Sequence, residues 1–432
     1  MINPQPNTNL LLNGDSLEVL KEMPDNILDA VVTDPPYGLS FMSKKWDYDV
    51  PSVELWKEVF RVMKPGAFLL SFAGTRTYHR MAVNIEDAGF EIRDMISWLY
   101  GSGFPKSLNI GKQVDKIEGN EREDLGRHPQ PGKSGKTHTR DGGAFKDNIH
   151  ITKGTSPWEG WGTALKPACE PIVVARKPLG EKNVASNVLK WGTGGINIDG
   201  CRVGFKNEDD YNESTKKNQH KDFDSKPVTN NVVYGDYSMM KPKNYAPQGR
   251  FPANIILDEE AGKILDEQTE GKVGNGHWAK TKVTGFGEFG NGKSEYFGVG
   301  KKDNDKGGAS RFFYCAKASK SERNLGCEEM PLKHYLAENK MGGEKDTMLT
   351  GSGNPRDCRK HNFHPTVKPI KLMRYLVRLV TKKGGLVLDP FLGSGTTACA
   401  CIKEGMNYIG IERDEEYMNI IKARIKAHEE SK

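Results

Sequence analysis

At 432 residues, with 36% hydrophobic and 28% charged residues, the chain is long enough for one large domain and a second, smaller region. It has no apolar run of about eighteen residues, and its first ten residues lack the features of a signal peptide, so we expect a cytoplasmic protein with no membrane span. The formal charge of +6 permits a polyanionic partner, and the seven cysteines include no CxxC pair, which argues against disulfides and a standard zinc site.

The N-terminal part of the chain alternates between strand and helix patterns. Short apolar runs predict strands, and apolar residues at helical spacing predict the helices between them. The expected strands are 10–15, 28–34, 67–72 and 92–99, and the expected helices are 16–23, a segment around 56–63, and 76–88.

The same alternation returns at the other end of the chain, with helices over 368–381 and 393–403 and strands over 386–389 and 408–412. Such alternation predicts an α/β fold with a mostly parallel sheet covered by helices on both faces. The middle is rich in glycine and aromatic residues and shows no period. We therefore predict a catalytic domain of residues 1–184 and 356–432, an insertion at 106–160, and a separate loop-rich region at 185–355.

Two glycines mark a tight turn between a strand and a helix in the segment 388–397, which reads LDPFLGSGTT. Gly393 and Gly395 let backbone approach a ligand closely, and Glu412 ends the next strand, where an acid can hold ribose hydroxyls. This pattern alone fits an ordinary turn or a dinucleotide dehydrogenase. Asp389 favours S-adenosylmethionine instead. An acid near the turn would repel a pyrophosphate, whereas S-adenosylmethionine has an amino group with which an acid can pair.

Upstream of the glycine turn, residues 362–369 read NFHPTVKP, a rigid extended turn that opens a helix. This turn suits the methionyl part of the same ligand, and it accounts for His364. The alternative is a metal cluster of Cys358, His361 and His364, the tightest grouping of such residues in the chain. We predict no metal.

The segment Asp34-Pro35-Pro36-Tyr37-Gly38 ends a predicted buried strand, and ligands bind outside the carboxyl ends of parallel strands. A proline-stiffened turn with a capping Asp is the simpler interpretation. An exocyclic amino group, however, is a poor nucleophile that needs two acceptors for its hydrogens, which the Asp34 carboxylate and the Pro35 carbonyl can supply. Tyr37 adds an aromatic face on which a base taken out of the duplex can stack.

These motifs, DPPYG and LDPFLGSGTT, resemble the catalytic and cofactor motifs of the amino-methylating DNA methyltransferases. Asn13-Gly14-Asp15 resembles the motif whose acid contacts the cofactor's adenine, and HPTVKP resembles the motif that lines the methionine site. The motif order is that of the β group. The resemblance covers roughly residues 8–180 and 360–430, and the stretches 98–106 and 161–174 look more like phage and prophage members. It implies a Rossmann-like methyltransferase fold that is circularly permuted, with the N-terminal strand beside the strand ending at Glu412.

The resemblance also implies S-adenosylmethionine as cofactor and methylation of a base amino group in double-stranded DNA. Adenine N6 is favoured over cytosine N4, because DPPY is more usual for adenine and SPPY for cytosine. The implied catalytic residues are Asp34, Pro35, Pro36 and Tyr37, and the implied cofactor-binding residues are Asp15, His364, Pro365, Thr366, Lys368, Asp389, Phe391, Gly393, Ser394, Gly395, Thr396 and Glu412.

Other functions stay open at this point. They are methylation of RNA, methylation of protein amides, a nicotinamide-dependent oxidoreductase, and a DNA-binding protein that has lost catalysis. A homodimer is compatible with the sequence, and a restriction endonuclease partner cannot be inferred from it.

The segment 301–325 holds seven basic residues against three acids, with three aromatic residues in a row at 312–314. A solvated basic loop is one interpretation. The other is target recognition within 185–355, because such residues suit phosphate contacts and base stacking. We expect Lys301, Lys302 and Lys306 to contact phosphates and Arg311 or Arg323 to read a base. Trp98 is either core or a second wall of the base pocket.

Overall fold

The computed structural model describes residues 9–39, 49–101, 103, 107–127, 150–216, 248–269, 308–316, 320–334, 347–349, 355–357 and 359–431. The chain divides into two compact units. The first unit consists of Met1–Gly101, Glu170–Glu328 and Thr366–Lys432, and the second consists of Ser102–Cys169 and Glu329–Pro365.

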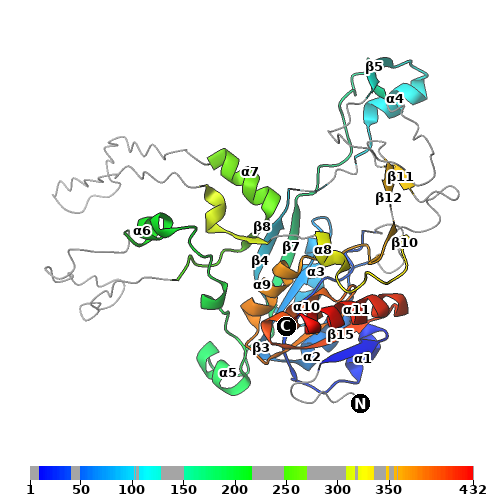
Figure 1. Ribbon diagram of the computed structural model, residues 1–432. Helices are drawn as coiled ribbons and strands as arrows, with labels where there is room; N and C mark the ends of the chain where they lie inside the picture. Colours follow the sequence, from blue (N-terminus) through cyan, green and yellow to red (C-terminus); the bar gives the residue numbers. More distant parts are fainter. Residues whose placement is uncertain are drawn as a thin grey trace, which may run out of the picture. The chain divides into compact units, whose positions relative to one another are not determined.

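A nine-stranded sheet lies at the centre of the first unit, in the order β1-β15-β14-β2-β3-β7-β4-β8-β9 (Figure 1). Neighbouring strands run parallel from β1 to β3 and from β4 to β9, and β7 is antiparallel to β3. The sheet is therefore mostly parallel, as predicted. Its strands are β1 (Leu10–Asn13), β2 (Leu28–Thr33), β3 (Met63–Phe72), β4 (Glu91–Leu99), β7 (Cys169–Arg176), β8 (Ile255–Asp258), β9 (Tyr314–Ala316), β14 (Leu386–Asp389) and β15 (Asn407–Glu412).

Two hydrophobic cores lie on the two faces of this sheet. Strand β2 is buried along its whole length, and it sends Ala30 and Val32 into one core and Val31 into the other, as the two-residue period of a strand requires. Helices α9 (Ile370–Val380), α10 (Thr396–Glu404) and α11 (Glu415–Glu430) pack into the first core. Helices α1 (Ser16–Lys21), α2 (Val53–Val62) and α3 (Tyr78–Asp87) pack into the second.

The first unit also holds short helices outside the two main layers. They are α5 (Val184–Trp191), η3 (Asp199–Cys201), α6 (Glu208–Lys216), α7 (Glu259–Thr269), η4 (Ala309–Phe312) and α8 (Lys320–Asn324).

The second unit contains α4 (Ile110–Glu118) and three strand pairs, all antiparallel: β5 (Glu123–Arg127) with β6 (His150–Lys153), β10 (Lys333–His334) with β13 (Arg359–Lys360), and β11 (Thr347–Leu349) with β12 (Pro355–Asp357). Within this unit, Arg122 forms ion pairs with Asp115 on α4 and with Glu159, and so holds these two segments together. In the described part of the chain, no helix is long and apolar enough to cross a lipid bilayer.

The predicted circular permutation is confirmed by the pairing of the first and last strands of the sheet. Strand β1 runs parallel to β15, with Asn13 opposite Glu412. The predicted strands and helices of residues 10–99 and 368–412 are also present, with ends displaced by a few residues. The apolar spacing that predicted them is the spacing that fills the two cores.

The observed units have different boundaries from the predicted domains. Strands β8 and β9, which belong to the predicted separate region 185–355, extend the central sheet beside β4. The second unit instead joins 102–169, most of which falls within the predicted insertion, to 329–365. Strands β8 and β9 are too short to give a long apolar run or a clear period, and they form only beside a neighbouring strand. The sequence therefore did not predict them.

Candidate active site

The segment DPPY and the glycine turn leave the sheet side by side. Strands β2 and β14 are parallel neighbours, so their carboxyl ends meet at one edge. From β14 the chain passes through α10 to β15 on one side, and from β2 it passes through α2 to β3 on the other. This is a topological switch point, the place where open α/β sheets bind ligands.

Four side chains form a polar cluster at the end of β2. The Lys368 ammonium donates to Asp34 Oδ2 at 2.7 Å and lies 3.0 Å from Glu170 Oε2. The Tyr37 hydroxyl is 2.6 Å from Asp34 Oδ1 and 3.2 Å from Glu170 Oε2. Lys368 Nζ is also 3.1 Å from the Tyr37 oxygen, so the cluster is closed on itself.

The charges of this cluster support one another. Burial lowers the pKa of Lys368, but the nearby carboxylates of Asp34 and Glu170 outweigh burial and raise that pKa above its ordinary value. Burial and the same two carboxylates raise the pKa of Tyr37 well above its ordinary value. Lys368 therefore stays a cation and Tyr37 stays a hydrogen-bond donor at any physiological pH.

Neighbouring elements hold the tetrapeptide in place. The Thr77 hydroxyl, just before α3, donates to the Tyr37 carbonyl at 2.6 Å, and the Pro35 ring is buried. Lys368 Nζ lies 4.8 Å from the centre of the Phe72 ring, and Trp98 meets that ring edge to face at 6.4 Å. Trp98 thus packs on the core behind the cluster, and its role as a wall of the base pocket stays a prediction.

The Asp389 carboxylate has a structural task at the end of β14. It accepts hydrogen bonds from the hydroxyls of Thr33 at 2.6 Å and Thr397 at 2.5 Å, and from the amide of Phe391 at 3.0 Å. Burial raises its pKa to about 6 in spite of these donors. Both oxygens are thus occupied by internal donors that tie β14 to β2 and α10. The predicted pairing with the amino group of a ligand has no direct support in this arrangement.

The glycine turn depends on left-handed backbone and on α11. Gly393 and Gly395 have φ of 56° and 81°, where glycine is favoured. A Cβ on Gly395 would lie 3.3 Å from Ile421 on α11, so this glycine is required by helix packing. The fully buried Arg424 of α11 donates to the Ser394 carbonyl at 2.5 Å and to the hydroxyls of Ser394 and Thr396 at 3.1 Å.

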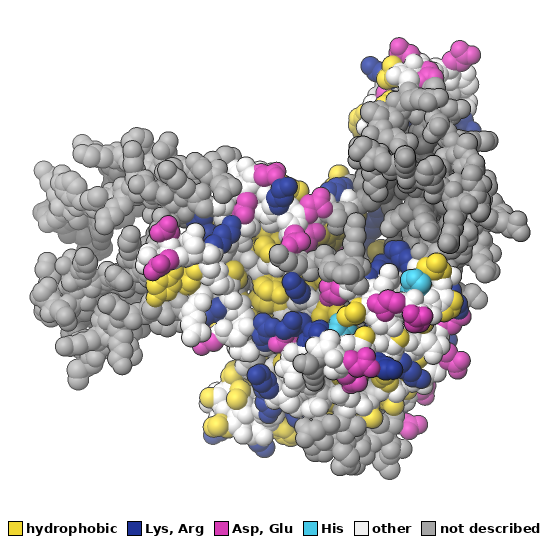
Figure 2. Space-filling view, in the orientation of Figure 1, with side chains coloured by type: hydrophobic (Ala, Val, Ile, Leu, Met, Phe, Trp, Pro, Cys, Tyr) yellow, Lys and Arg dark blue, Asp and Glu magenta, His cyan; other side chains and the backbone are white. Residues whose placement is uncertain are grey.

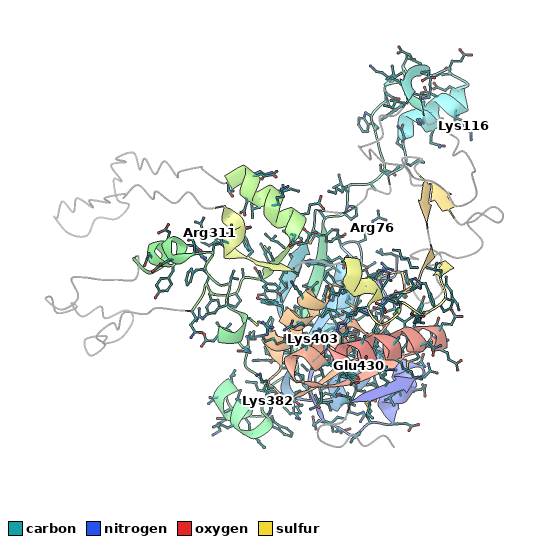
Figure 3. All side chains as sticks on the ribbon, in the orientation of Figure 1. Arg76, Lys116, Arg311, Lys382, Lys403 and Glu430 are labelled. Carbon is teal, nitrogen blue, oxygen red and sulfur yellow. The ribbon has the colours of Figure 1, made fainter. Side chains whose placement is uncertain are left out.

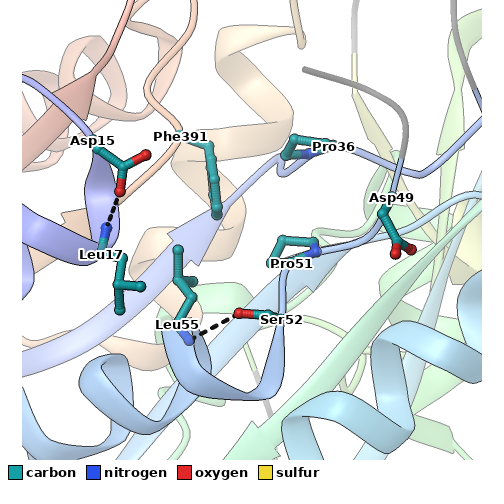
Figure 4. Close-up of a pocket in the computed structure, with 8 residues that line it drawn as sticks. All are labelled: Asp15, Leu17, Pro36, Asp49, Pro51, Ser52, Leu55 and Phe391. Carbon is teal, nitrogen blue, oxygen red and sulfur yellow. Dashed lines mark hydrogen bonds between the residues drawn. The ribbon is translucent and has the colours of Figure 1, made fainter. Parts of the chain in front are cut away.

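An open hollow of about 270 Å³ lies beside the turn (Figure 4). Asp15, which caps α1 by accepting from Leu17 N–H at 3.0 Å, stands on one side of it, and the Phe391 ring and Pro36 stand close by. The remaining lining residues are Leu17, Asp49, Pro51, Ser52 and Leu55. An acid, an aromatic ring and apolar surface suit a flat heteroaromatic group, so the hollow fits the adenine of the predicted cofactor.

Glu412, at the end of β15, lies next to the turn. Its carboxylate accepts from the amides of Gly393 at 2.7 Å and Asp414 at 2.8 Å. Burial is the largest influence on this carboxyl and raises its pKa to about 7, against the opposing effect of the two amides. Hydroxyl donors on a ligand would favour the ionised form, as the predicted ribose contact requires.

The predicted motif HPTVKP crosses the boundary between the two units. Thr366 and Lys368 belong to the first unit, whereas His364 and Pro365 belong to the second, where the His364 amide donates to Asn362 Oδ1 at 3.2 Å. Lys368 contacts Asp34 through its ammonium, and its predicted role in binding the cofactor stays a prediction. Among the described residues, no group of three His, Cys, Asp or Glu side chains could hold a metal, and Cys358 lies outside them.

The predicted DNA contacts divide between described and undescribed residues. Lys301, Lys302 and Lys306 lie outside the described residues. Arg311 is buried, with its guanidinium 3.3 Å from Asp210 and stacked near the Phe312 ring (Figure 3). Reading a base would require this side chain to leave its place in the fold, so the structure does not favour that role. Arg323 lies half-buried on α8.

Glu170 was missed by the sequence analysis. It stands near the start of β7, in a stretch noted only for its likeness to phage proteins. The available signal was an acidic residue at the start of an apolar run, Glu-Pro-Ile-Val-Val. Nothing in the sequence spacing indicates that residue 170 lies near residue 34 or 368.

A parallel α/β sheet with a carboxylate motif and a glycine turn side by side at its switch point defines a ligand-binding enzyme of the Rossmann-like class. A family profile described as DNA methylase, for N6 and N4 methyltransferases, matches residues 28–423. The chain therefore belongs to this N6/N4 DNA methylase family.

Individual relatives match shorter stretches. The type II methyltransferase M2.DpnII of Streptococcus pneumoniae is 34% identical over 104 residues, which is 23% of this chain and 39% of that protein. The type II methyltransferase M.BglI of Bacillus subtilis is 45% identical over 62 residues, 14% of this chain and 18% of that protein. The chain thus spans well under half the length of each of these relatives.

Two solved structures align along most of the chain at low identity. The PvuII DNA methyltransferase, described as cytosine-N4-specific, has a TM-score of 0.41 and 14% identity, covering 96% of this chain and 86% of its own. The complex of M1.HpyAVI with S-adenosylmethionine has a TM-score of 0.36 and 15% identity, covering 97% and 100%. The family assignment rests on the profile match.

Proposed function

We propose that the protein transfers a methyl group from S-adenosylmethionine to the exocyclic amino nitrogen of a base in DNA, and that this base is adenine, methylated at N6. The observation that carries the proposal is that Asp34 and the glycine turn follow the ends of two adjacent strands, β2 and β14. The hydrogen bond from Thr33 to Asp389 joins these two strand ends. Methyl acceptor and methyl donor would then meet at one edge of the sheet.

Asp34 and Pro35 do the work on the acceptor. The Asp34 carboxylate takes one hydrogen of the amino group and the Pro35 carbonyl takes the other, so that the nitrogen lone pair is directed away from both. Lys368 holds the Asp34 carboxylate in place by donating to its Oδ2 at 2.7 Å. Tyr37 presents its ring to the base, while its hydroxyl is held by Asp34 and Glu170.

The residues that would hold the cofactor are those of the hollow and the turn. Asp15 and Phe391 would hold its adenine, Glu412 its ribose hydroxyls, and the backbone around Gly393 its remaining part. When bound, S-adenosylmethionine supplies an electrophilic methyl group on a sulfonium. The protein's own task is to hold the amino nitrogen in line with that group and to keep water out.

Adenine is proposed on the Asp34 of DPPY, because the family's adenine members more usually have Asp and its cytosine members Ser at this position. The proposed partner is double-stranded DNA. We propose that the protein acts in the cytoplasm.

The test is methylation of unmodified genomic DNA by the purified protein with isotopically labelled S-adenosylmethionine, followed by digestion and mass spectrometry of the nucleosides. We expect label in N6-methyl-2′-deoxyadenosine, and none with Asp34→Ala. Label in N4-methyl-2′-deoxycytidine would replace adenine by cytosine as the proposed base. Label only in added RNA would refute the DNA assignment, and calorimetric binding of NAD but not S-adenosylmethionine would refute the methyltransferase.

A further inference from the structure

Glu170 joins the cluster from a strand that carries none of the recognised motifs. Its side chain is 23% exposed, and the same oxygen, Oε2, contacts both Lys368 and Tyr37. Strand β7 is antiparallel to β3, so its first residues lie at the edge where β2 and β3 end. The topology therefore brings a second carboxylate to the catalytic one.

The cluster holds two carboxylates and one ammonium, so it has one net negative charge. Asp34 alone would be fully neutralised by Lys368 at 2.7 Å. With Glu170 at 3.0 Å on the other side, the ammonium is shared between two acceptors. A carboxylate that shares its cation is a stronger hydrogen-bond acceptor than one that holds the cation alone.

The proposed reaction needs that net charge. The amino nitrogen forms a bond to the methyl carbon while the sulfur–methyl bond breaks, and positive charge develops on the nitrogen until one N–H proton leaves, with Asp34 as the nearest acceptor. A negative site stabilises this developing cation, and a neutral one would not.

We propose that Glu170 is a positioning residue for methyl transfer, which shares Lys368 with Asp34 and thereby leaves the Asp34 carboxylate available as an acceptor for the base amino group. This inference rests on the proposed function. Glu170 acts through Lys368 and Tyr37 and does not itself touch the base.

Three variants and a matched control test the proposal. Glu170→Gln removes the charge and keeps the shape, Glu170→Asp keeps the charge, and Lys368→Met removes the shared cation. Glu404→Gln is the control, because Glu404 is likewise a carboxylate of low exposure in an ion-pair cluster, where it pairs with Arg374 and Arg378 on α9 and not with Lys368. Thermal melting and calorimetric binding of S-adenosylmethionine show whether each variant is folded and loaded.

The decisive measurement is the single-turnover rate of methyl transfer against pH. We expect Glu170→Gln to slow transfer by about tenfold to a hundredfold, with cofactor affinity within about threefold of wild type, and Glu170→Asp to recover part of the loss. The acidic limb of the profile should move to lower pH in Glu170→Gln and to higher pH in Lys368→Met. A purely structural role would lower the rates without these opposite displacements.

A second measurement does not depend on activity. Acetic anhydride reacts only with uncharged amines, so the acetylation of Lys368 at high pH, followed by mass spectrometry against Lys403, reports how firmly the cluster holds its charge. Lys368 should react faster in Glu170→Gln than in wild type. Unchanged acetylation and an unchanged rate profile in Glu170→Gln would overturn the proposal. Absence of methyl transfer by the wild type on every nucleic acid, with the acetylation difference present, would instead refute the proposed function and leave the ion cluster in place.

Discussion

Asp34 meets several hydrogen-bonding demands at once. Its Oδ1 accepts from Tyr37 and its Oδ2 from Lys368, and in the proposed reaction it also accepts from the base. A carboxylate offers about four lone-pair sites, so a third donor can bind without displacing the first two. The cluster therefore requires no rearrangement before the base arrives, which is the preorganisation that electrostatic catalysis uses.

Asp34→Asn should lower the single-turnover rate of methyl transfer by at least about 10²-fold to 10³-fold, the usual loss when one electrostatic stabiliser is removed. The amide keeps the size of the side chain but directs an N–H group toward Lys368 or the base. Calorimetry should show cofactor affinity within a few-fold of wild type, because Asp34 contacts the acceptor. A variant that retained more than about a hundredth of the wild-type rate would contradict this role.

Glu412 gives the cofactor site a pH dependence. Burial raises the pKa of Glu412 to about 7, and hydroxyl donors from a ligand would favour its ionised form, so binding must release a proton below that pH. We expect affinity for S-adenosylmethionine to be constant above pH 7 and to weaken by up to about tenfold for each pH unit below it. Calorimetry in two buffers of different ionisation enthalpy counts the released proton. Glu412→Gln should bind weakly at every pH and release none, and a pH-independent wild type would count against the ribose contact.

Local sequence was sufficient for some of these residues and insufficient for others. The four adjacent residues of DPPY allow roles for Asp34 and Tyr37 to be predicted from the sequence alone. The contact of Lys368 with Asp34 was not predicted, and Glu170 was missed, because both depend on which strands lie side by side. Strand β7 enters the sheet between β3 and β4, an order that no local pattern encodes.

At the scale of elements, the glycine turn is built jointly by β14 and α11. The turn supplies left-handed glycines, and the helix supplies the buried guanidinium of Arg424 and the packing surface of Ile421. The Nε and Nη2 atoms of Arg424 have no partner within the described residues, which is costly for a buried guanidinium. Helix α11, which follows β15 in sequence, thus helps fix the shape of the turn between β14 and α10.

Arg424→Met should lower both stability and cofactor affinity. The variant leaves the Ser394 carbonyl without its charged donor, a loss of about 1.5–3 kcal/mol that removal of the unpaired N–H groups partly offsets. We expect a melting temperature lower by a few degrees and about tenfold weaker binding of S-adenosylmethionine. Thermal melting and calorimetry measure the two effects. Unchanged affinity would show that α11 does not shape the cofactor turn.

Gly395→Ala should destabilise the protein chiefly through α11. The left-handed backbone costs an alanine roughly 1–2 kcal/mol, and its Cβ would also press on Ile421. We therefore expect lower thermal stability and a parallel loss of cofactor binding. Ile421→Ala removes the Cγ1 and Cγ2 atoms that the new Cβ would meet but leaves the backbone strain, so in an Ile421→Ala background Gly395→Ala should still lower the melting temperature, by less than in wild type. No loss in that background would show that sterics alone require the glycine.

The elements that periodicity predicted are those that fill the two large cores. Helix α9 places Leu372, Leu376 and Leu379 in one core at the spacing that the sequence displays. Strands β8 and β9 have only four and three residues, and they form because β8 pairs with the edge of β4 and β9 pairs with β8. Such elements depend on tertiary context, so the predicted boundary at residue 185 did not coincide with an observed one.

At the scale of the whole molecule, the proposed reaction requires DNA to reach the edge where β2 and β14 end. On the face drawn in Figure 2, the described Lys and Arg side chains lie interspersed with Asp and Glu, so charge alone does not mark a path for DNA there. The opposite edge of the sheet, where the strands begin, carries Lys382, Lys383 and Lys403, two of which are labelled in Figure 3. These lysines provide a control for any test of DNA contacts.

Replacing Lys301, Lys302 and Lys306 together by Gln should weaken DNA binding and lower its salt dependence by up to about three units of slope, near 0.9 for each phosphate that is no longer neutralised. The control triple of Lys382, Lys383 and Lys403 removes the same charge from the far edge and should change the slope little. Fluorescence anisotropy across a salt series measures both. Equal slopes in the two triples would place DNA recognition outside the 301–306 segment.

The permuted order of strands also has a consequence for synthesis of the chain. Strand β14 lies in the interior of the sheet, between β15 and β2, yet the ribosome makes it more than 350 residues after β2, since Leu388 and Val31 are register partners. Until then β2 presents an apolar strand with one open hydrogen-bonding edge, the kind of surface that invites wrong pairing. The Asp34 carboxylate is thus among the first groups translated, yet its strand gains β14 as a neighbour only late in synthesis, so the proposed activity must wait until the C-terminal part of the chain has emerged.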